Sequence, residues 1–210
     1  MAQRRIVLTG GPGAGKTAIL EIVRIVFGDE VTVLPESASI LFGGGFPRSD
    51  GLVAKRAAQR AIYRVQRELE LMADEEAKHP VVLCDRGTLD AIAYWPGQVE
   101  DFWAQVGSSA EAELARYSGV IHLRTPSKHN GYNHKNPVRT EDAEEAAAID
   151  ARIYQAWGAH PARVLIESED HFVDKVNAAL HAVRAFLRTD SGRVGDPQPP
   201  EQAGGQSGHK

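Results

Sequence analysis

The chain has 210 residues, of which 42% are hydrophobic and 25% are charged, so we expect one soluble globular domain with a core large enough to fold alone. Its formal net charge of −4 gives no global attraction for nucleic acid, and any affinity for anions must therefore be local. The single cysteine, Cys84, excludes a disulfide framework and a cysteine-based zinc cluster. Since no apolar run approaches the ~18–20 residues of a membrane span and no signal peptide is recognisable, we expect a cytoplasmic protein.

A phosphate-binding motif lies between the first predicted strand, 5–9, and the first predicted helix, 18–27. It matches the pattern G-x-x-x-x-G-K-[ST] and reads Gly10-Gly11-Pro12-Gly13-Ala14-Gly15-Lys16-Thr17. In such a loop, backbone N–H groups surround the phosphates, the lysine contacts the β/γ-phosphates, and the threonine hydroxyl ligates Mg²⁺. The order of strand, loop and helix also directs a positive helix N-terminus at the phosphates. We therefore predict an ATP–Mg²⁺ site, with a chance glycine-rich turn as the alternative.

The second predicted strand, 31–34, leads directly to Pro35 and Glu36, and a loop that contains Gly43 to Gly45 follows. Ligands of open α/β sheets collect at the carboxyl ends of the strands, where Glu36 stands. A carboxylate there is suited to accept a proton from a substrate hydroxyl that attacks the γ-phosphate. The alternative is that Glu36 caps a loop or a helix.

A long helix is predicted over 52–78, with one apolar face that we expect to enter the core. The residues of that face are Ala58, Ile62, Val65, Leu69 and Met72. The opposite face carries the arginine stripe Arg56, Arg60, Arg64 and Arg67. This stripe either faces an anionic substrate or is solvated and balanced by Glu68 and Glu70, and we predict the solvated face.

Asp85 and Arg86 follow the third predicted strand, 80–84, directly. Because Mg²⁺ prefers oxygen ligands, Asp85 is a candidate to organise the metal, and Arg86 is a candidate to stabilise the transferred phosphoryl group. A structural ion pair at the strand end is the alternative. Asp90 either faces the same cleft or stabilises the N-terminus of a helix predicted over 88–95.

The remaining elements alternate in the same manner, which predicts a parallel sheet with crossover helices. Helices are expected at 99–106, 108–117, from Thr140 onward and at 171–188, and strands at 119–123 and 163–166. We predict a lid over about 125–140, because this polar segment carries several basic side chains suited to close over phosphates. Arg124 and Arg139, at the two ends of the segment, are the predicted phosphate clamps. The domain is expected to end near 188, with a disordered tail over 189–210.

This order of motifs resembles P-loop small-molecule kinases. The nearest resemblance is to compact bacterial "AAA domain" ATP-binding proteins, a family that includes ribosylnicotinamide kinase domains and is related more distantly to deoxynucleoside and thymidylate kinases. It covers residues 4–188 and implies a three-layer α/β P-loop NTPase fold of the nucleoside-monophosphate-kinase type, with a five-stranded parallel sheet in the order 2-3-1-4-5. It also implies that Glu36 is the base and that Asp85 and Arg86 hold metal and phosphate. The long helix often lines the acceptor pocket in these kinases, so Gln59, Tyr63 and Gln66 are candidates to contact an acceptor, although we expect core or surface roles for them.

Two functions remain open at this point. The first is transfer of the ATP γ-phosphoryl group to a small hydroxyl-bearing acceptor, nucleoside-like or otherwise, with catalytic roles for Lys16, Glu36, Asp85, Arg86 and Arg139. The second is a nucleotide-dependent binding switch with slow ATP or GTP hydrolysis and a protein or lipid partner. The guanine motif N-K-x-D is absent, since Asn133-His134-Lys135-Asn136 lacks the aspartate. A mechanical AAA+ motor is disfavoured, because Arg86 occupies the place of its second acidic residue. No motif specifies the acceptor, the base preference or the oligomeric state.

Overall fold

A computed structural model describes residues 3–126, 143–168 and 171–188. The described residues contain a five-stranded sheet in the order β2-β3-β1-β4-β5, in which all neighbouring strands are parallel. This confirms the predicted topology. The strands are β1 (Arg4–Thr9), β2 (Val31–Leu34), β3 (Val81–Asp85), β4 (Gly119–Leu123) and β5 (Arg163–Ile166).

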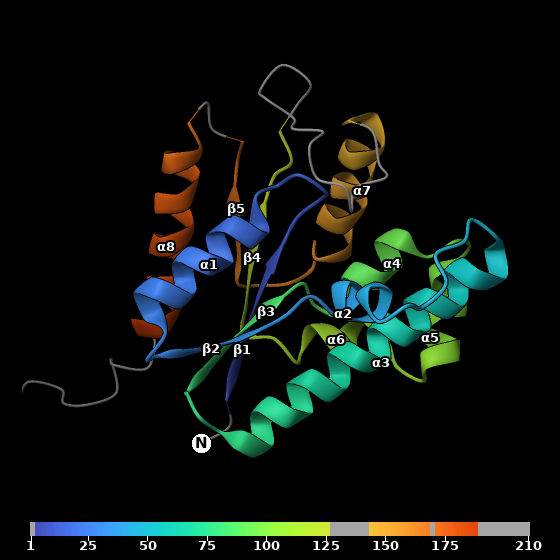
Figure 1. Ribbon diagram of the computed structural model, residues 1–210, viewed down its shortest axis with the longest axis horizontal. Coiled ribbons are helices and arrows are strands. Elements are labelled where there is room, and N and C mark those ends of the chain that lie inside the picture. The colour runs from blue at the N-terminus through green and yellow to red at the C-terminus, as the bar shows by residue number, and fades with distance from the viewer. Residues whose placement is uncertain (1–2, 127–142, 169–170, 189–210) are drawn as a thin grey trace, which may run out of the picture.

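Helices cover both faces of the sheet and make a three-layer structure, with α1 and α8 on one face and α3 to α7 on the other (Figure 1). The helices are α1 (Lys16–Phe27), α2 (Ser37–Gly43), α3 (Leu52–Glu76), α4 (Asp90–Tyr94), α5 (Val99–Val106), α6 (Ala110–Leu114), α7 (Ala143–Ala156) and α8 (Phe172–Arg188). The short helix α2 was not predicted, because the glycine-rich segment at its C-terminal end is typical of a loop. Among the described residues, no helix is long and apolar enough to cross a membrane.

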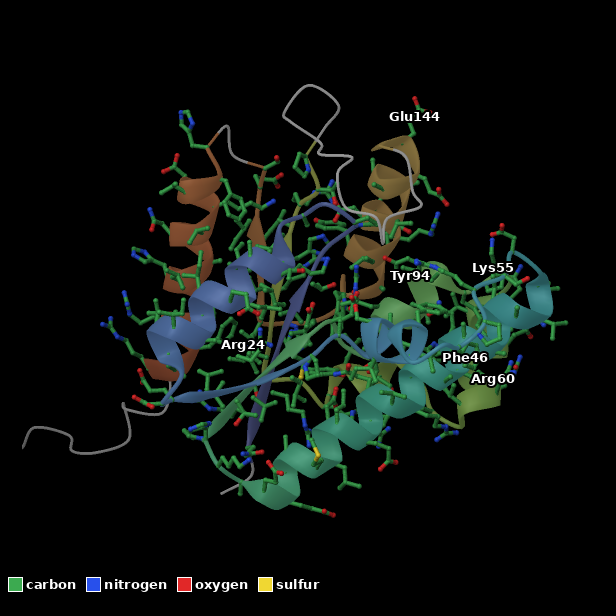
Figure 2. The ribbon with its side chains drawn as sticks, viewed as in Figure 1. Arg24, Phe46, Lys55, Arg60, Tyr94 and Glu144 are labelled. Atoms are coloured by element: carbon green, nitrogen blue, oxygen red, sulfur yellow. The ribbon has the colours of Figure 1, made fainter. Side chains whose placement is uncertain are left out.

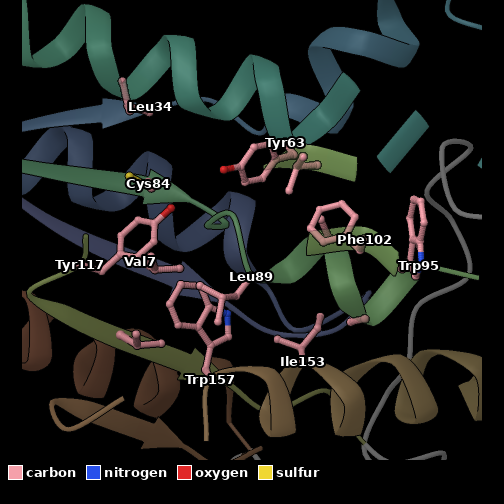
Figure 3. Close-up of a cluster of buried hydrophobic side chains, with 14 of the residues drawn as sticks. Val7, Leu34, Tyr63, Cys84, Leu89, Trp95, Phe102, Tyr117, Ile153 and Trp157 are labelled. Carbon is pink, nitrogen blue, oxygen red and sulfur yellow. The ribbon is translucent and has the colours of Figure 1, made fainter. Parts of the chain in front are cut away.

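Two hydrophobic cores fill the spaces between the layers, because successive side chains of each buried strand point to opposite faces. On β1, Ile6 and Leu8 pack with α1 and α8, whereas Val7 packs on the other face. This second core contains Leu89 and Trp157 and lies beneath the turn that follows β3 (Figure 3).

The face of α3 that enters the core differs from the predicted one. Ala58 is buried as expected, but Met72 is 48% exposed, and the other buried residues of the helix are Tyr63, Gln66, Glu70 and Ala73. Apolar periodicity misplaces the face because polar side chains enter the core with their hydrogen bonds satisfied. Gln66 donates to Glu70 Oε1 at 2.8 Å, and the Tyr63 hydroxyl donates to Glu113 Oε1 at 2.6 Å.

The arginine stripe of α3 remains at the surface, as predicted, with Arg64 exposed and the other three arginines half-buried, but its side chains also bond to neighbouring elements. Arg56 donates to the backbone carbonyl of Pro96, in the turn before α5, at 3.2 Å, and Arg64 donates to that of Val106, the last residue of α5, at 2.8 Å. Arg60, on the part of α3 that crosses α5 (Figure 2), donates to a glutamine of α5. The Glu70 that we expected to balance these charges in solvent is fully buried. The stripe therefore holds α3 against α5.

Candidate active site

The phosphate loop connects β1 to α1, and its glycines allow a conformation that other residues rarely adopt. Gly10, Gly13 and Gly15 have φ angles of +139°, +81° and +92°. A Cβ atom on Gly10 would lie 2.1 Å from the carbonyl oxygen of Leu123, so a side chain there would push β1 away from β4. The described backbone therefore has the positive-φ turns and the helix N-terminus of an anion-binding loop.

Lys16 lies folded across this loop. Its Nζ donates to the carbonyl oxygens of Gly10 and Gly11 at 2.9 and 3.2 Å. Burial and the nearby Arg86 charge lower the pKa of Lys16 to about 8, although the surrounding carboxylates oppose this shift. An incoming phosphate would bring further negative charge next to this buried ammonium group.

Glu36, Asp85 and Arg86 meet beside the phosphate loop, because β3 lies between β2 and β1 in the sheet. Arg86 Nε donates to Glu36 Oε1 at 2.6 Å, and Arg86 Nη1 donates to the Gly10 carbonyl oxygen at 3.1 Å. One guanidinium group thus joins the carboxyl end of β2 to the first glycine of the loop. Residues that the sequence places 50 or more positions apart form one cluster of charges.

Glu36 precedes α2, yet its carboxylate accepts no backbone N–H bond that would cap this helix. Its Oε2 accepts a hydrogen bond from the Ser39 hydroxyl at 2.6 Å. Burial raises the pKa of Glu36, but the charges of Arg86 and Lys16 outweigh burial and lower it to about 2. The carboxylate is therefore ionised throughout the physiological pH range.

Asp85 fits the role of a magnesium-organising residue. Its Oδ1 is buried and has no hydrogen-bond partner among the described residues. Burial raises the pKa of Asp85 to about 6, a shift that Lys16 opposes and the neighbouring Glu36 supports. A bare carboxylate oxygen is a ligand that Mg²⁺ prefers, and the exposed Thr17 at the start of α1 carries the hydroxyl that the motif assigns to the metal.

Asp90 does not face the cleft, which was one of its two predicted roles. It is 3% exposed, and it accepts hydrogen bonds from the backbone N–H of Gly87 at 3.2 Å and from Arg86 Nη1 at 3.0 Å. The Gly87 N–H lies before α4, which has no side-chain cap, so this bond holds the turn after β3. The Asp90 charge itself stands in the first turn of α4, as the other role predicted. The second bond, to the site arginine, was not predicted.

Arg124 is held next to the phosphate loop by Asp150 of α7, a residue that sequence analysis did not single out. Arg124 Nη1 lies 2.9 Å from Asp150 Oδ2, and Asp150 Oδ1 accepts the Gly11 N–H at 2.9 Å. The same oxygen lies 2.9 Å from Nε2 of the buried His122. Nothing in the local sequence signals this cluster, because its members come from β4, α7 and the loop. Arg139 and most of the predicted lid fall within 127–142 and lie outside the described residues.

Two of the candidate acceptor residues on α3 are already engaged inside the protein. Tyr63 donates to Glu113, and Gln66 accepts a hydrogen bond from Ser37 at 2.7 Å, so both have the core roles that we expected. Phe172, at the start of α8, is 46% exposed. A Cβ on Gly15 would lie 2.7 Å from its ring, which places an aromatic side chain against the phosphate loop.

The chain belongs to the AAA domain family, whose model matches residues 5–175. Its fold is that of known nucleoside and nucleotide kinases. A deoxyadenosine kinase from M. mycoides, solved with bound dATP, is 14% identical with a TM-score of 0.59, and the match covers 87% of this chain and 100% of that one. A thymidylate kinase from Candida albicans is 12% identical with a TM-score of 0.56, and the match covers 89% and 93% of the two chains. No curated protein sequence matches the chain.

Proposed function

We propose that this protein is an ATP- and Mg²⁺-dependent phosphotransferase that moves the γ-phosphoryl group to a hydroxyl of a small acceptor, nucleoside-like or another metabolite. The observation that carries this proposal is the convergence of Lys16, Glu36, Asp85 and Arg86 on one side of the phosphate loop. The cluster combines two cations for phosphate with two carboxylates for a metal and an acceptor. The free buried thiol of Cys84 is consistent with work in a reducing cytoplasm.

The two cations have separate tasks in this proposal. Lys16 neutralises charge on the β- and γ-phosphates, and the loop from Gly10 to Thr17 supplies backbone donors to the phosphates. Arg86 stabilises charge on the transferred group, assisted by Arg139 from the predicted lid, while Arg124 contributes to nucleotide binding. Thr17 and Asp85 would hold Mg²⁺, which would supply positive charge to offset the negative charge of the phosphates.

Glu36 has the task that separates transfer from hydrolysis. Because its pKa is about 2, it is ionised and available to accept a hydrogen bond from an acceptor hydroxyl. Phosphoryl transfer proceeds through a loose transition state in which orientation of the nucleophile matters more than early proton removal. A low pKa therefore suits Glu36 to orient an acceptor and to receive its proton late.

The binding switch remains the competing function, with a protein or lipid partner in place of an acceptor. The Glu36 carboxylate favours transfer over the switch, because it is held beside the phosphate loop and caps no helix. No nucleic acid partner is proposed, since the net charge is −4.

The direct test is a screen of hydroxyl-bearing metabolites with ATP and Mg²⁺, coupled to ADP release. We expect a small set of related acceptors to accelerate ADP release well above the rate without acceptor. Lys16→Ala is the control, because it should abolish the acceleration and thereby exclude a contaminating kinase. If no metabolite pool accelerates ADP release and the ATP-loaded protein instead retains a protein or lipid, the switch replaces the kinase.

A further inference from the structure

We propose that Asp90 is a positioning residue that sets the orientation of the Arg86 guanidinium group, and that Thr9 and Trp157 hold Asp90 in place. The geometric part of this proposal concerns the protein without ligand. Its consequence for catalysis rests on the proposed function.

Asp90 receives hydrogen bonds from three different parts of the fold. Its Oδ1 accepts from the Thr9 hydroxyl at the end of β1 and from Arg86 Nη1. Its Oδ2 accepts from the Trp157 indole Nε1 at 3.0 Å, as well as from the Gly87 N–H. Trp157 is fully buried immediately after α7, where its ring lies beside Leu89 (Figure 3). The carboxylate is therefore fixed independently of Arg86.

Capping of a helix does not explain this arrangement. A cap accepts a backbone N–H of the first helical turn, whereas the Gly87 N–H that bonds to Oδ2 precedes α4, and α4 has no side-chain cap. The other oxygen, Oδ1, points to Arg86 and Thr9. A buried carboxylate is costly unless it is paired, and Arg86 is the cation that forms an ion pair with it.

Arg86 needs such support because its backbone is held in an unusual conformation. Its φ angle is +68°, in the left-handed region that residues other than glycine seldom occupy. Such conformations persist only where the surrounding structure over-determines them. A Cβ on the next residue, Gly87, would lie 2.7 Å from the Trp157 ring, so the same tryptophan also packs against this turn.

The two carboxylates fix the plane of the guanidinium group. Glu36 accepts from Nε, whereas Asp90 and the Gly10 carbonyl accept from Nη1. Nη2 has no protein partner in the part of the chain that the structure describes. If Asp90 loses its charge, Arg86 keeps the carboxylate of Glu36, the Gly10 carbonyl and the Tyr94 ring, but Nη1 loses its only ionic partner and the direction of Nη2 is less firmly fixed.

Nuclear magnetic resonance of arginine side chains tests the geometric part without any nucleotide. In the full chain, we expect a slowly exchanging Arg86 Nη1–H signal, because Nη1 is the nitrogen that donates to Asp90, and we assign it by its loss in Arg86→Lys. In Asp90→Asn, which keeps the shape of the side chain, this N–H should exchange at least about 10-fold faster, because a charge-assisted network has been lost. Glu70→Gln is the matched control: it removes an equally buried carboxylate that accepts from Gln66, Tyr117 and Arg116, and it should leave the Arg86 signal unchanged.

Thr9→Val provides a second variant in case Asp90→Asn does not fold. It removes one donor to Asp90 and leaves Asp90 itself intact, so we expect a smaller acceleration of Arg86 Nη1–H exchange in the same direction. An Arg86 signal that is unchanged in whichever of the two variants folds would overturn the proposal.

Kinetics test the consequence for catalysis. Asp90→Asn should lower kcat for Mg²⁺-dependent ATP turnover about 10–100-fold and leave KM for ATP nearly unchanged, since misplacement of a transition-state group costs on this scale. In the Arg86→Lys background, Asp90→Asn should have little further effect, because the group that it positions is gone. Fully additive losses would contradict a positioning role. If Asp90→Asn accelerates exchange of the Arg86 N–H but neither the wild type nor any variant turns over ATP, the positioning role stands and the proposed function fails.

Discussion

Arg86 and Glu36 are bonded to each other at 2.6 Å in the protein without ligand, although the proposed reaction assigns them to different substrates. In that proposal, Arg86 serves the transferred phosphoryl group and Glu36 serves the acceptor. In the proposed reaction, this ion pair would therefore lie where the two substrates meet. It also keeps the Glu36 carboxylate ionised before either substrate arrives.

Glu36→Gln should leave ATP affinity nearly intact and lower acceptor phosphorylation by roughly 10²–10⁴, the usual scale for a lost general base. The amide keeps the shape of the side chain but cannot take up the acceptor proton. Calorimetry measures ATP affinity, and steady-state assays measure transfer. Acceptor phosphorylation within a few-fold of wild type would remove Glu36 from the reaction.

ATP binding should be accompanied by proton uptake near pH 8.5. The Lys16 ammonium has a pKa of about 8 in the free protein, so at this pH it is largely neutral. Bound phosphate raises that pKa, and the lysine then takes up a proton. Calorimetry in buffers of different ionisation enthalpy measures the uptake, and the uptake should disappear well below pH 8.

Two variants give the controls for this prediction. Lys16→Arg remains charged and should bind ATP without proton uptake, because an arginine is protonated at every pH used. Lys16→Ala should keep its fold by circular dichroism and lose most of its ATP affinity. Unchanged affinity and turnover in Lys16→Ala would overturn the assignment of the phosphate loop.

Asp85→Asn should stabilise the protein without ligand and remove Mg²⁺-dependent turnover. The pKa of Asp85 is about 6 in the folded protein, against 3.8 for an unperturbed aspartate, so the folded state binds more protons between these two pH values. Stability is therefore lost as pH rises from about 4 to about 6. At pH 7.5 the ionised carboxylate costs on the order of 1–3 kcal/mol, which the amide avoids.

Urea denaturation at pH 4.5 and pH 7.5 measures this effect, and the gain from Asp85→Asn should be larger at pH 7.5. An Asp85→Asn variant that is less stable than wild type at pH 7.5, with normal Mg²⁺ dependence, would show that Asp85 is a structural residue.

Those parts of the structure that depend on local signals could be predicted from the sequence. The phosphate loop and the five strands follow from a glycine motif and from apolar runs separated by helices, whereas the strand order was implied by the resemblance to P-loop kinases. Glu36, Asp85 and Arg86 were found because each stands at the carboxyl end of a strand. Strand ends meet at one edge of a parallel sheet, so position alone brought these residues together.

The contacts that hold these residues in place were not predictable in the same way. Asp150 bonds to Gly11 across 139 positions, and Trp157 bonds to Asp90 across 67. Glu70 and Gln66 look like surface residues in the sequence, yet both are buried because distant partners satisfy them. Apolar periodicity identifies only the apolar face of a helix, whereas the buried face of α3 is partly polar.

Gly87→Ala should destabilise the fold by about 1–3 kcal/mol, the cost of overpacking a filled core. The added Cβ would lie 2.7 Å from the Trp157 ring and 2.8 Å from Val7. Gly43→Ala is the control, because a Cβ there meets nothing within 4 Å, and its stability should equal or slightly exceed wild type. Thermal unfolding followed by circular dichroism compares the two, and equal midpoints would disprove the close packing of this turn.

The fate of the γ-phosphoryl group tests the central claim most directly. The protein is incubated with ATP labelled at the γ-phosphate, Mg²⁺ and the acceptor pool that most accelerates ADP release, and the labelled products are separated. The proposed function predicts one labelled organic phosphate in a one-to-one ratio with ADP, a yield that falls in Glu36→Gln while ATP binding persists. Label found only as inorganic phosphate, at the same rate in wild type and Glu36→Gln, would contradict it.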